Sequence, residues 1–273
     1  MIDFTPLKGL EEPSPPSYSR PYLGMSAVGQ ECDRKTLLSW RWVTKTSHDA
    51  RIQRIFDLGH NLEQVIIDSI RNMTDVRLKY VGTDQLEIIG PYGHWRGHPD
   101  GILEDDQSGT YMIEIKTHKD DLFKKLKKSG VQGGHPSHYD QMQVYMGSMN
   151  MPDECVYIAI NKDTCEFYCE IIEVDFDRIN SLKERMEHIV TTDSLPPRIG
   201  NNKPNFYKCK MCEYSDVCFE KEPLDINCRT CKYFAVKPDG VFGCIKHKIE
   251  SLDLSSQEKG CADHQLDAEY FKL

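Results

Sequence analysis

Hydrophobic residues recur along the chain at two different spacings. In residues 50 to 72 they fall at helical intervals, which predicts an amphipathic helix with one face in a core. Residues 94 to 104 and 110 to 117 are rich in β-branched and aromatic residues and are separated by turn formers, which predicts a hairpin. Further helices are predicted near 31–45, 136–150 and 176–191, and further strands near 75–80, 85–90, 155–161 and 165–175.

The predicted hairpin carries acids and a lysine in an ordered arrangement. Side chains alternate along a strand, so Glu114 and Lys116 share one face while Ile113 and Ile115 share the other. Asp100 can then lie across from Glu114. These two carboxylates and the Ile115 carbonyl form a hard-oxygen site suited to Mg²⁺ or Mn²⁺, and Lys116 supplies positive charge for phosphoryl chemistry. Exposed hairpins with alternating acids and lysines are also common, so the match alone is weak.

Two predicted helices add polar residues at i, i+4 spacing. Gly59 and Glu63 share a helical face, where the glycine permits close approach to the sheet and Glu63 can point at the metal. His60 is the alternative ligand. Gln141 and Tyr145 form a second polar pair on a helix otherwise rich in Met and Val, and this pair can hydrogen-bond a substrate phosphate.

The order and spacing of these motifs resemble the RecB-type PD-(D/E)xK nucleases. The matching residues are Gly59 with Glu63, Asp100, the run Glu114-Ile115-Lys116, and Gln141 with Tyr145. In that family the helix residue four after the glycine is often His, whereas this chain has Glu63 there and His60 directly after Gly59; Glu63 is the preferred ligand. The resemblance implies an α/β fold with a mixed central sheet flanked by helices, which hydrolyses DNA with one or two divalent metals.

Eleven cysteines in 273 residues indicate bound metal in a reducing compartment. Cys209, Cys212 and Cys218 form a C-x2-C-x5-C run, and Cys32 precedes a predicted helix, where a lone cysteine is ordinarily a buried residue. The CRISPR-associated RecB-like exonucleases, nuclease subunits of bacterial end-resection complexes and phage exonucleases carry one cysteine before the nuclease motifs and three after them. Similarity to them implies that these four cysteines hold a structural [4Fe-4S] cluster, with four-cysteine zinc as the alternative.

A second cysteine group follows near the C-terminal end of the sequence. Cys228 and Cys231 form a C-x2-C knuckle with Cys244 and Cys261 as partners, and His247 and His264 as substitutes. This set predicts a small zinc-binding appendage, because a segment this short needs a metal to stabilise it; free thiols are the alternative. Such segments also trail the nuclease in some phage relatives. Cys155, Cys165 and Cys169 lie in predicted strands and are expected in the core, with no chemistry assigned.

Length and composition divide the chain into three parts. The 39% hydrophobic content is enough for one core. We expect a flexible arm over residues 1–24, a nuclease domain over 25–222 and a zinc-binding tail over 223–273. The polar, Pro-rich start and the lack of any 18-residue apolar window predict a soluble, cytoplasmic protein with no membrane partner, in the host cytoplasm if phage-encoded.

The net charge of −9 opposes nucleic acid as a substrate, but local charge matters more than the sum. Basic residues gather in two segments, which are either solvated faces or phosphate contacts. They are Lys119, Lys124, Lys125, Lys127 and Lys128 in one segment, and Arg34, Lys35, Arg41, Arg51 and Arg54 in the other. Trp40, Trp42 and Trp95 either stack on bases or pack inside.

Together these features predict a DNA exonuclease that acts on single-stranded ends during recombination, replication or repair. Its partners would be DNA and a recombination or replication protein. An endonuclease built on the same core is one alternative. A non-catalytic DNA-binding or assembly factor, whose acids are incidental, is another.

Overall fold

A computed structural model describes residues 10–148, 150–220 and 222–272, and its chain forms two compact units. The sheet unit comprises residues 10–14, His48–Ile88 and Gly97–Lys183. The cysteine-rich unit comprises Pro15–Ser47, Ile89–Arg96 and the residues from Glu184 onward. Both units are assembled from separated stretches of sequence, so neither coincides with the arm, nuclease domain and tail expected from the sequence.

A five-stranded mixed sheet with the order β2-β5-β6-β7-β8 forms the centre of the sheet unit. β6 and β7 run parallel, and the other neighbours run antiparallel. The strands are β2 (Val76–Lys79), β5 (Gly101–Asp105), β6 (Gly109–His118), β7 (Glu154–Asn161) and β8 (Phe167–Glu173). The predicted mixed sheet is therefore present, including the β5–β6 hairpin.

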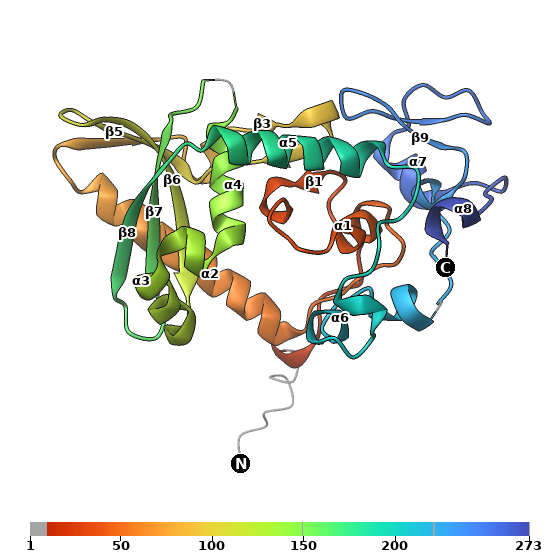
Figure 1. Cartoon of the computed structure of the whole chain (residues 1–273), viewed down its shortest axis with the longest axis horizontal. Helices are drawn as coiled ribbons and strands as arrows, with labels where there is room; N and C mark the ends of the chain where they lie inside the picture. The colour runs from red at the N-terminus through yellow and green to blue at the C-terminus, as the bar shows by residue number, and fades with distance from the viewer. Residues whose placement is uncertain (1–9, 149, 221, 273) are drawn as a thin grey trace, which may run out of the picture. The chain divides into compact units, whose positions relative to one another are not determined.

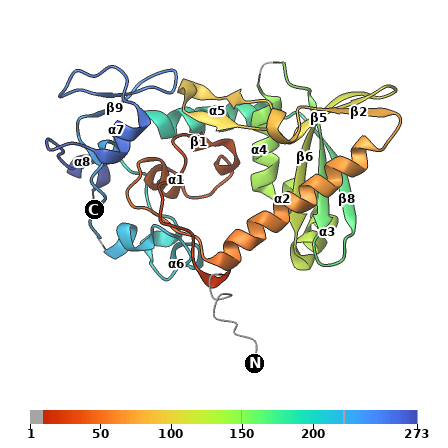
Figure 2. The same cartoon turned by 180° about the vertical axis from the view of Figure 1, so that it is seen from behind.

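Helices cover both faces of this sheet. They are α2 (Ala50–Arg71), α3 (Asp120–Gly134), α4 (Pro136–Met146) and the start of α5 (Phe176–Thr191). Figure 1 shows α3 and α4 in front of the sheet, and Figure 2, from behind, shows α2 crossing the opposite face. Ile66 and Ile70 of α2 belong to the same buried cluster as Ile113 and Ile115 of β6. The residues between those isoleucines must therefore face α3 and α4.

The predicted strand over residues 94 to 104 is interrupted in its middle. Its first part is β4 (Trp95–Gly97), which belongs to a separate sheet of order β1-β4-β3 with β1 (Leu23–Gly24) and β3 (Ile88–Ile89). Pro99 offers no amide hydrogen to a strand ladder, so pairing stops there. β5 begins two residues later, which leaves Asp100 immediately before the strand.

Helix α3 was not expected from the lysine-rich sequence that forms it. Phe123 and Leu126 are fully buried at i, i+3 spacing, but three glycines in the following turns hide the helical pattern. At Gly130 the backbone leaves helical geometry, with φ 65° and ψ −179°. Among the helices of the described residues, none combines the length and apolar character needed to cross a membrane.

The cysteine-rich unit contains short elements. They are α1 (Asp33–Trp40), α6 (Tyr207–Lys210), β9 (Phe234–Val236), β10 (Phe242–Cys244), α7 (Leu254–Lys259) and α8 (Ala268–Phe271). One-turn helices lie at Met25–Ala27, Pro91–Gly93, Gly200–Asn202, Asp216–Glu220 and Cys228–Thr230, and the sheet unit has a similar turn at Gly82–Asp84.

Residues 15–24 pack in the cysteine-rich unit: Tyr18 stacks on Trp42, with ring centroids 5.2 Å apart, and Trp42 Nε1 donates to the Ser19 carbonyl. The buried Arg229 guanidinium lies 3.6 Å from the centre of the Trp42 ring and donates to the carbonyl of Pro21. This part of the expected arm is therefore held by specific contacts.

Candidate metal-dependent active site and cysteine groups

The acids of the hairpin lie where β5 begins beside the middle of β6. Asp100 Oδ2 accepts a hydrogen bond of 2.6 Å from the backbone N–H of Ile115. Glu114 is fully buried on the sheet face toward α4, and one of its oxygens pairs with the Lys116 ammonium. The other oxygen, Oε2, has no hydrogen-bond partner within the described part of the chain. A buried carboxylate oxygen without a partner is costly, and a cation would satisfy it.

The electrostatics of these groups indicate that they are close neighbours. Burial, and next to it the charge of Asp100, raise the pKa of Glu114 to about 8, against the opposing effect of Lys116. Burial also raises the pKa of Asp100, although Lys116 and the Ile115 N–H act in the other direction. Burial by itself would lower the pKa of Lys116, but Glu114 and Asp100 more than offset it. A divalent ion would let both acids ionise together.

Helix α2 brings a third carboxylate, Glu63, within electrostatic reach of Asp100 and Glu114. Burial and the charge of Asp100 raise the pKa of Glu63, while His60 and Lys116 lower it. His60 is exposed, and its Nδ1 lies 3.0 Å from the Phe56 carbonyl oxygen, which leaves Nε2 available as a ligand.

Gly59 faces Thr117 of β6, but a Cβ at position 59 would stand 3.7 Å from the Thr117 hydroxyl, which is an ordinary contact. Space alone therefore does not require glycine at this position.

Gln141 and Tyr145 lie buried on α4 beside the acids. Gln141 Nε2 donates to the Tyr145 hydroxyl at 3.1 Å, and that hydroxyl donates to the His98 carbonyl at 3.4 Å. Burial, followed by the charge of Glu114, raises the pKa of Tyr145, so this hydroxyl stays protonated. The pair can present hydrogen-bond donors toward the carboxylate cluster.

An open groove of about 530 Å³ leads to this cluster. It is lined by residues of α2, the C-terminal part of β6 and the turn between α3 and α4, namely Ile55, Phe56, Gly59, His60, Glu63, Ile115, Lys116, Thr117, His118, Leu122, His135 and His138. Ligand sites in proteins have volumes of this order. Three of the lining residues, His118, His135 and His138, were not identified from the sequence, although His118 follows Lys116 at the strand period and His138 precedes Gln141 at the helix period.

The first cysteine group comes together within the cysteine-rich unit. Cys32, Cys209, Cys212 and Cys218 line one small cavity of about 30 Å³. Cys32 Sγ accepts from the N–H of Lys35 at 3.4 Å, and Arg198 Nε donates to Cys218 Sγ at 3.3 Å. Burial and the nearby thiols Cys32 and Cys218 raise the pKa of Cys209. Four converging thiols with N–H donors directed at their sulfurs fit a bound metal group.

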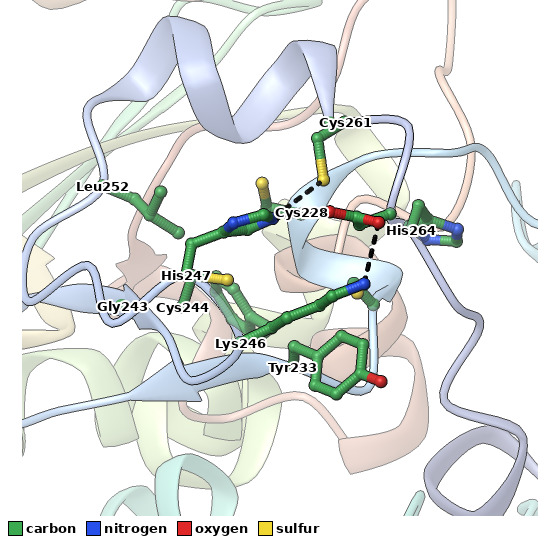
Figure 3. A pocket seen from close by; sticks show the side chains of 13 residues that line it. Cys228, Tyr233, Gly243, Cys244, Lys246, His247, Leu252, Cys261 and His264 are labelled. Carbon is green, nitrogen blue, oxygen red and sulfur yellow. Dashed lines mark hydrogen bonds and ion pairs between the residues drawn. The ribbon is translucent and has the colours of Figure 1, made fainter.

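The second cysteine group surrounds a cavity of about 20 Å³ in the same unit. Figure 3 shows the side chains of Cys228, Cys244 and Cys261 directed into this space. Cys231 also lines it, and burial and the three other thiols raise the pKa of Cys228 to about 11. His247 Nε2 lies 3.9 Å from Cys261 Sγ and 3.3 Å from a carboxylate oxygen of Asp263.

His264, the other histidine that could replace a thiol, also lines the cavity, and its Nε2 lies 3.1 Å from the Thr230 hydroxyl.

The spacing of the thiols bears on what each group could hold. A zinc ion bound by four sulfurs at about 2.3 Å keeps neighbouring sulfurs about 3.8 Å apart. Across the described ranges, His118, His135 and His138 are the one set of three or more whose ligand atoms all lie within 4.8 Å of one another. No three thiols are that close, so a single zinc ion requires the cysteine side chains to rotate inward, whereas a four-iron cluster occupies more space.

Several residues expected at a DNA surface or in the core lie elsewhere. Trp40, Trp42 and Trp95 are buried, which confirms packing as their role. Arg34 and Arg41 are also buried, and Arg41 lies against the rings of Phe234, Tyr270 and Phe271, so neither arginine is placed to bind phosphate. Lys119, Lys124 and Lys127 pair with acidic residues. Cys155 is buried as expected, but Cys165 is exposed in the turn between β7 and β8, and Cys169 is exposed on β8 at the edge of the sheet.

Neither a family model nor a curated protein matches the chain. Solved structures similar to it include the alkaline exonuclease LHK-Exo from Laribacter hongkongensis, at 19% identity and a TM-score of 0.46, covering 62% of this chain and 86% of that chain. LHK-Exo in complex with dAMP has the same identity and coverage, with a TM-score of 0.45. SSO0001 aligns at 17% identity and a TM-score of 0.45, covering 74% of this chain and 88% of that chain. Because these identities and TM-scores are low, function is inferred from the side chains of the site.

Proposed function

We propose that the chain is a Mg²⁺- or Mn²⁺-dependent DNA exonuclease that hydrolyses phosphodiester bonds at single-stranded ends, in recombination, replication or repair. One observation carries the proposal: the fully buried Glu114, whose Oε2 has no hydrogen-bond partner among the described residues, pairs with the Lys116 ammonium within electrostatic reach of Asp100 and Glu63. Buried acids that raise one another's pKa lower the stability of the fold when they are ionised, and a bound cation would offset this cost.

Each residue has a role in this proposal. Glu63, Asp100 and Glu114 would hold the divalent ion, with the Ile115 carbonyl as a further oxygen ligand. The bound ion would supply Lewis acidity and lower the pKa of the attacking water. Lys116 stays protonated beside the acids, so its ammonium can orient the nucleophile and stabilise the charge that develops on the phosphate.

The polar pair on α4 has a positioning role. Gln141 and Tyr145 are already hydrogen-bonded to each other, so their donors are fixed before substrate binds. Both lie on the side of the sheet that Glu114 faces. They would hold the strand in line with the attacking water.

Two substitutions test the carboxylate site directly. Asp100→Asn and Glu114→Gln keep the side-chain size but remove the charge, and we expect each to lower cleavage of labelled DNA in Mg²⁺ or Mn²⁺ by about 10³-fold or more. Glu104→Gln is the matched control, because Glu104 is a β5 carboxylate that pairs with Lys79 at the surface. If folded Asp100→Asn protein cleaves DNA as fast as wild type, the proposed site is wrong.

A second comparison separates an exonuclease from an endonuclease on the same core. An enzyme that requires an end leaves circular single-stranded DNA intact while degrading the same sequence as a linear strand. Equal cleavage of both forms would instead assign endonuclease activity to the site.

We further propose that Cys32, Cys209, Cys212 and Cys218 hold a [4Fe-4S] cluster with a structural role. The support is the convergence of four thiols around one cavity and the N–H donors from Lys35 and Arg198 that are directed at two of the sulfurs.

For Cys228, Cys231, Cys244 and Cys261 we propose a structural zinc ion. The support is their shared cavity and the C-x2-C knuckle at Cys228 and Cys231. Because thiolates repel one another, a cation at this position would also lower the pKa of Cys228. Side-chain rotation toward the ion would accompany its binding.

A further inference from the structure

Three histidines form a compact stack in the groove beside the carboxylate site. His118 ends β6, His135 lies at the junction of α3 and α4, and His138 follows in the first turn of α4. The ring centroids of His135 and His118 are 4.2 Å apart, those of His135 and His138 are 5.1 Å apart, and those of His118 and His138 are 5.6 Å apart. The ring planes differ by only 10° to 27°.

The stack continues the periodicity of the proposed active site. Glu114, Lys116 and His118 occupy alternate positions on one face of β6, since successive side chains of a strand point to opposite faces. His138 precedes Gln141 by three residues on α4, which places it on the same helical face. The strand β6 and the helix α4, which carry residues of the proposed active site, therefore also carry His118 and His138 of the stack.

One nitrogen of each ring has a protein contact, which holds the ring in place. His118 Nε2 and His138 Nδ1 lie 2.8 and 3.0 Å from the Tyr157 hydroxyl, and His135 Nε2 lies 3.2 Å from the Leu122 carbonyl oxygen.

The histidines are uncharged at neutral pH. Burial, then the neighbouring positive groups, lower the pKa of His118 to about 4 and that of His138 to about 2. Burial also lowers the pKa of His135. A neutral stack does not attract phosphate, so any role in binding must come from the ring faces.

One ring face of the stack remains without an aromatic partner. If His135 were sandwiched between the other two rings, they would be much further apart than either is from His135. The short His118–His138 distance excludes that arrangement, so these two rings leave at least one face of His135 without an aromatic partner. No other aromatic contact of His135 is found in the described ranges, and the residue is only partly buried in the groove wall.

The surroundings of that face are apolar, whereas the other end of the groove is charged. Ile55, Phe56 and Leu122 line the groove and are 36%, 46% and 38% exposed, which is unusual for such side chains unless something covers them. Glu63 and Lys116 line the same groove. The groove therefore has an apolar, aromatic wall at one end and charged side chains at the other. A nucleotide has the matching parts, an aromatic base and a charged phosphate.

We propose that the free face of His135 stacks against one unpaired nucleobase of the substrate strand while the phosphate of that strand lies at Lys116. This assignment rests on the proposed nuclease function and specifies its substrate as a strand with exposed base faces. A paired base in a duplex is already covered on both faces, so it cannot use this surface. Stacking is also tolerant of sequence, because every base has a π face.

The platform is held rigidly, so little order is lost when a base binds. His135 N donates to the Val131 carbonyl at 2.7 Å, and Pro136 restricts the backbone directly after it. The Tyr157 hydroxyl joins the two histidines beneath. Fixing the rings in advance lowers the entropic cost of binding.

The test combines a change in the protein with a change in the DNA. Binding of a short single-stranded DNA is measured in Ca²⁺, which supports binding without requiring cleavage, and is compared with the same strand made of abasic residues. Stacking on one base contributes about 1 to 3 kcal/mol, so His135→Ala should weaken binding of the normal strand by roughly 5- to 100-fold. The same variant should bind the abasic strand as wild type does.

Two further variants interpret the result. His135→Phe keeps an aromatic face without ligating nitrogen and should restore affinity for the normal strand. His188→Ala, at an exposed position of α5, should change nothing. Equal weakening by His135→Ala on both strands, or a folded His135→Phe that fails to restore binding, would overturn the stacking role. Binding that requires added Zn²⁺ and is lost in His135→Phe would assign a metal site instead.

The outcomes also separate this proposal from the nuclease proposal. If wild type binds single strands with the expected base dependence but hydrolyses none in Mg²⁺ or Mn²⁺, the nuclease assignment fails and the stacking site stands. If it hydrolyses DNA while His135→Ala has no base-dependent effect, only the stacking assignment fails.

Discussion

At the residue scale, Lys116 has two electrostatic effects. Its ammonium pairs with the buried Glu114 and lowers the pKa of the neighbouring acids, which favours their ionised, metal-binding form. It also reaches the groove where a phosphate would lie. Removing this one charge should therefore weaken both the metal site and the stabilisation of the transition state.

We expect Lys116→Gln to reduce DNA hydrolysis by about 10²- to 10³-fold at saturating Mg²⁺, because the developing phosphate charge loses its partner. Lys79→Gln is the control, since Lys79 is an exposed lysine of β2 in the same sheet. Initial rates on labelled single-stranded DNA give the comparison. Rates for Lys116→Gln within twofold of wild type would exclude a catalytic role for this lysine.

The buried histidines predict how stability responds to acid. The ordinary pKa of 6.5 is lowered to about 4 for His118 and to about 2 for His138. As pH falls from about 6.5 toward 4, these histidines take up protons in the unfolded chain but stay neutral in the folded chain. The stabilisation present above pH 6.5 is therefore lost over this range. Each histidine should cost on the order of 1 to 2 kcal/mol of unfolding free energy between pH 7 and pH 5.

Urea unfolding at the two pH values, with metal chelated, measures this loss. His138→Gln should make the loss smaller, because the glutamine amide does not titrate but can still bond the Tyr157 hydroxyl. His188→Gln, at an exposed position, should leave it unchanged. An identical pH dependence in wild type and His138→Gln would contradict buried, neutral histidines.

At the element scale, the bend of α3 decides where the histidine stack lies. Gly130 has φ 65° and ψ −179°, a conformation that essentially only glycine adopts. After it, Val131 N donates to Glu170 at 2.8 Å, which fastens the end of α3 to β8. The chain then turns into α4 with His135 at the junction.

Gly130→Ala should therefore destabilise the fold by about 1 to 3 kcal/mol, because alanine is strained at this φ and its Cβ would stand 3.2 Å from the Glu170 carboxylate. Gly133→Ala is the control in the same helix: its Cβ would also stand 3.2 Å from a neighbour, the Ser129 Cβ, but φ carries no such strain, so the change should cost less than Gly130→Ala. Denaturant midpoints give the comparison. Equal midpoints for the two variants would show that the bend does not depend on glycine.

At the scale of the whole molecule, the first cysteine group joins residues far apart in the chain. A cluster held by Cys32 and Cys209–Cys218 would close a loop of well over 100 residues and would stabilise the fold by about 4 to 5 kcal/mol, if a covalent cross-link is a fair comparison. Protein purified without oxygen should be brown and contain about four irons per chain. Cys32→Ser should lose this iron and unfold at lower temperature, whereas Cys169→Ser, at an exposed position on β8, should retain it.

Colourless wild-type protein that contains zinc alone would refute the iron-sulfur assignment.

The second cysteine group should behave independently of the first. Cys228→Ser should remove about one zinc per chain while leaving the iron content unchanged, because the two sets of ligands are separate. Elemental analysis of both variants against wild type provides the measurement. Loss of iron in place of zinc from Cys228→Ser would assign the C-terminal group to a cluster instead.

The sequence by itself determined the elements whose patterns are local. Alternation along β6 separates Glu114 and Lys116 from Ile113 and Ile115, and the isoleucines pack under α2 as this pattern predicts. The helical repeat of residues 50 to 72 became α2, with its end at Arg71. Both patterns could be read because they follow from strand and helix geometry, which depends on neighbours in sequence.

Only the tertiary structure decided which distant side chains meet. The bend at Gly130 and the return of β7 beside β6 bring His118, His135 and His138 together, although no motif links them. Likewise residues 15–24 read as a polar arm, yet they contact Trp42 and Arg229, which lie elsewhere in the chain. The physical reason is that local propensity fixes backbone conformation, whereas burial, ring stacking and pKa depend on neighbours brought close by folding of the whole chain.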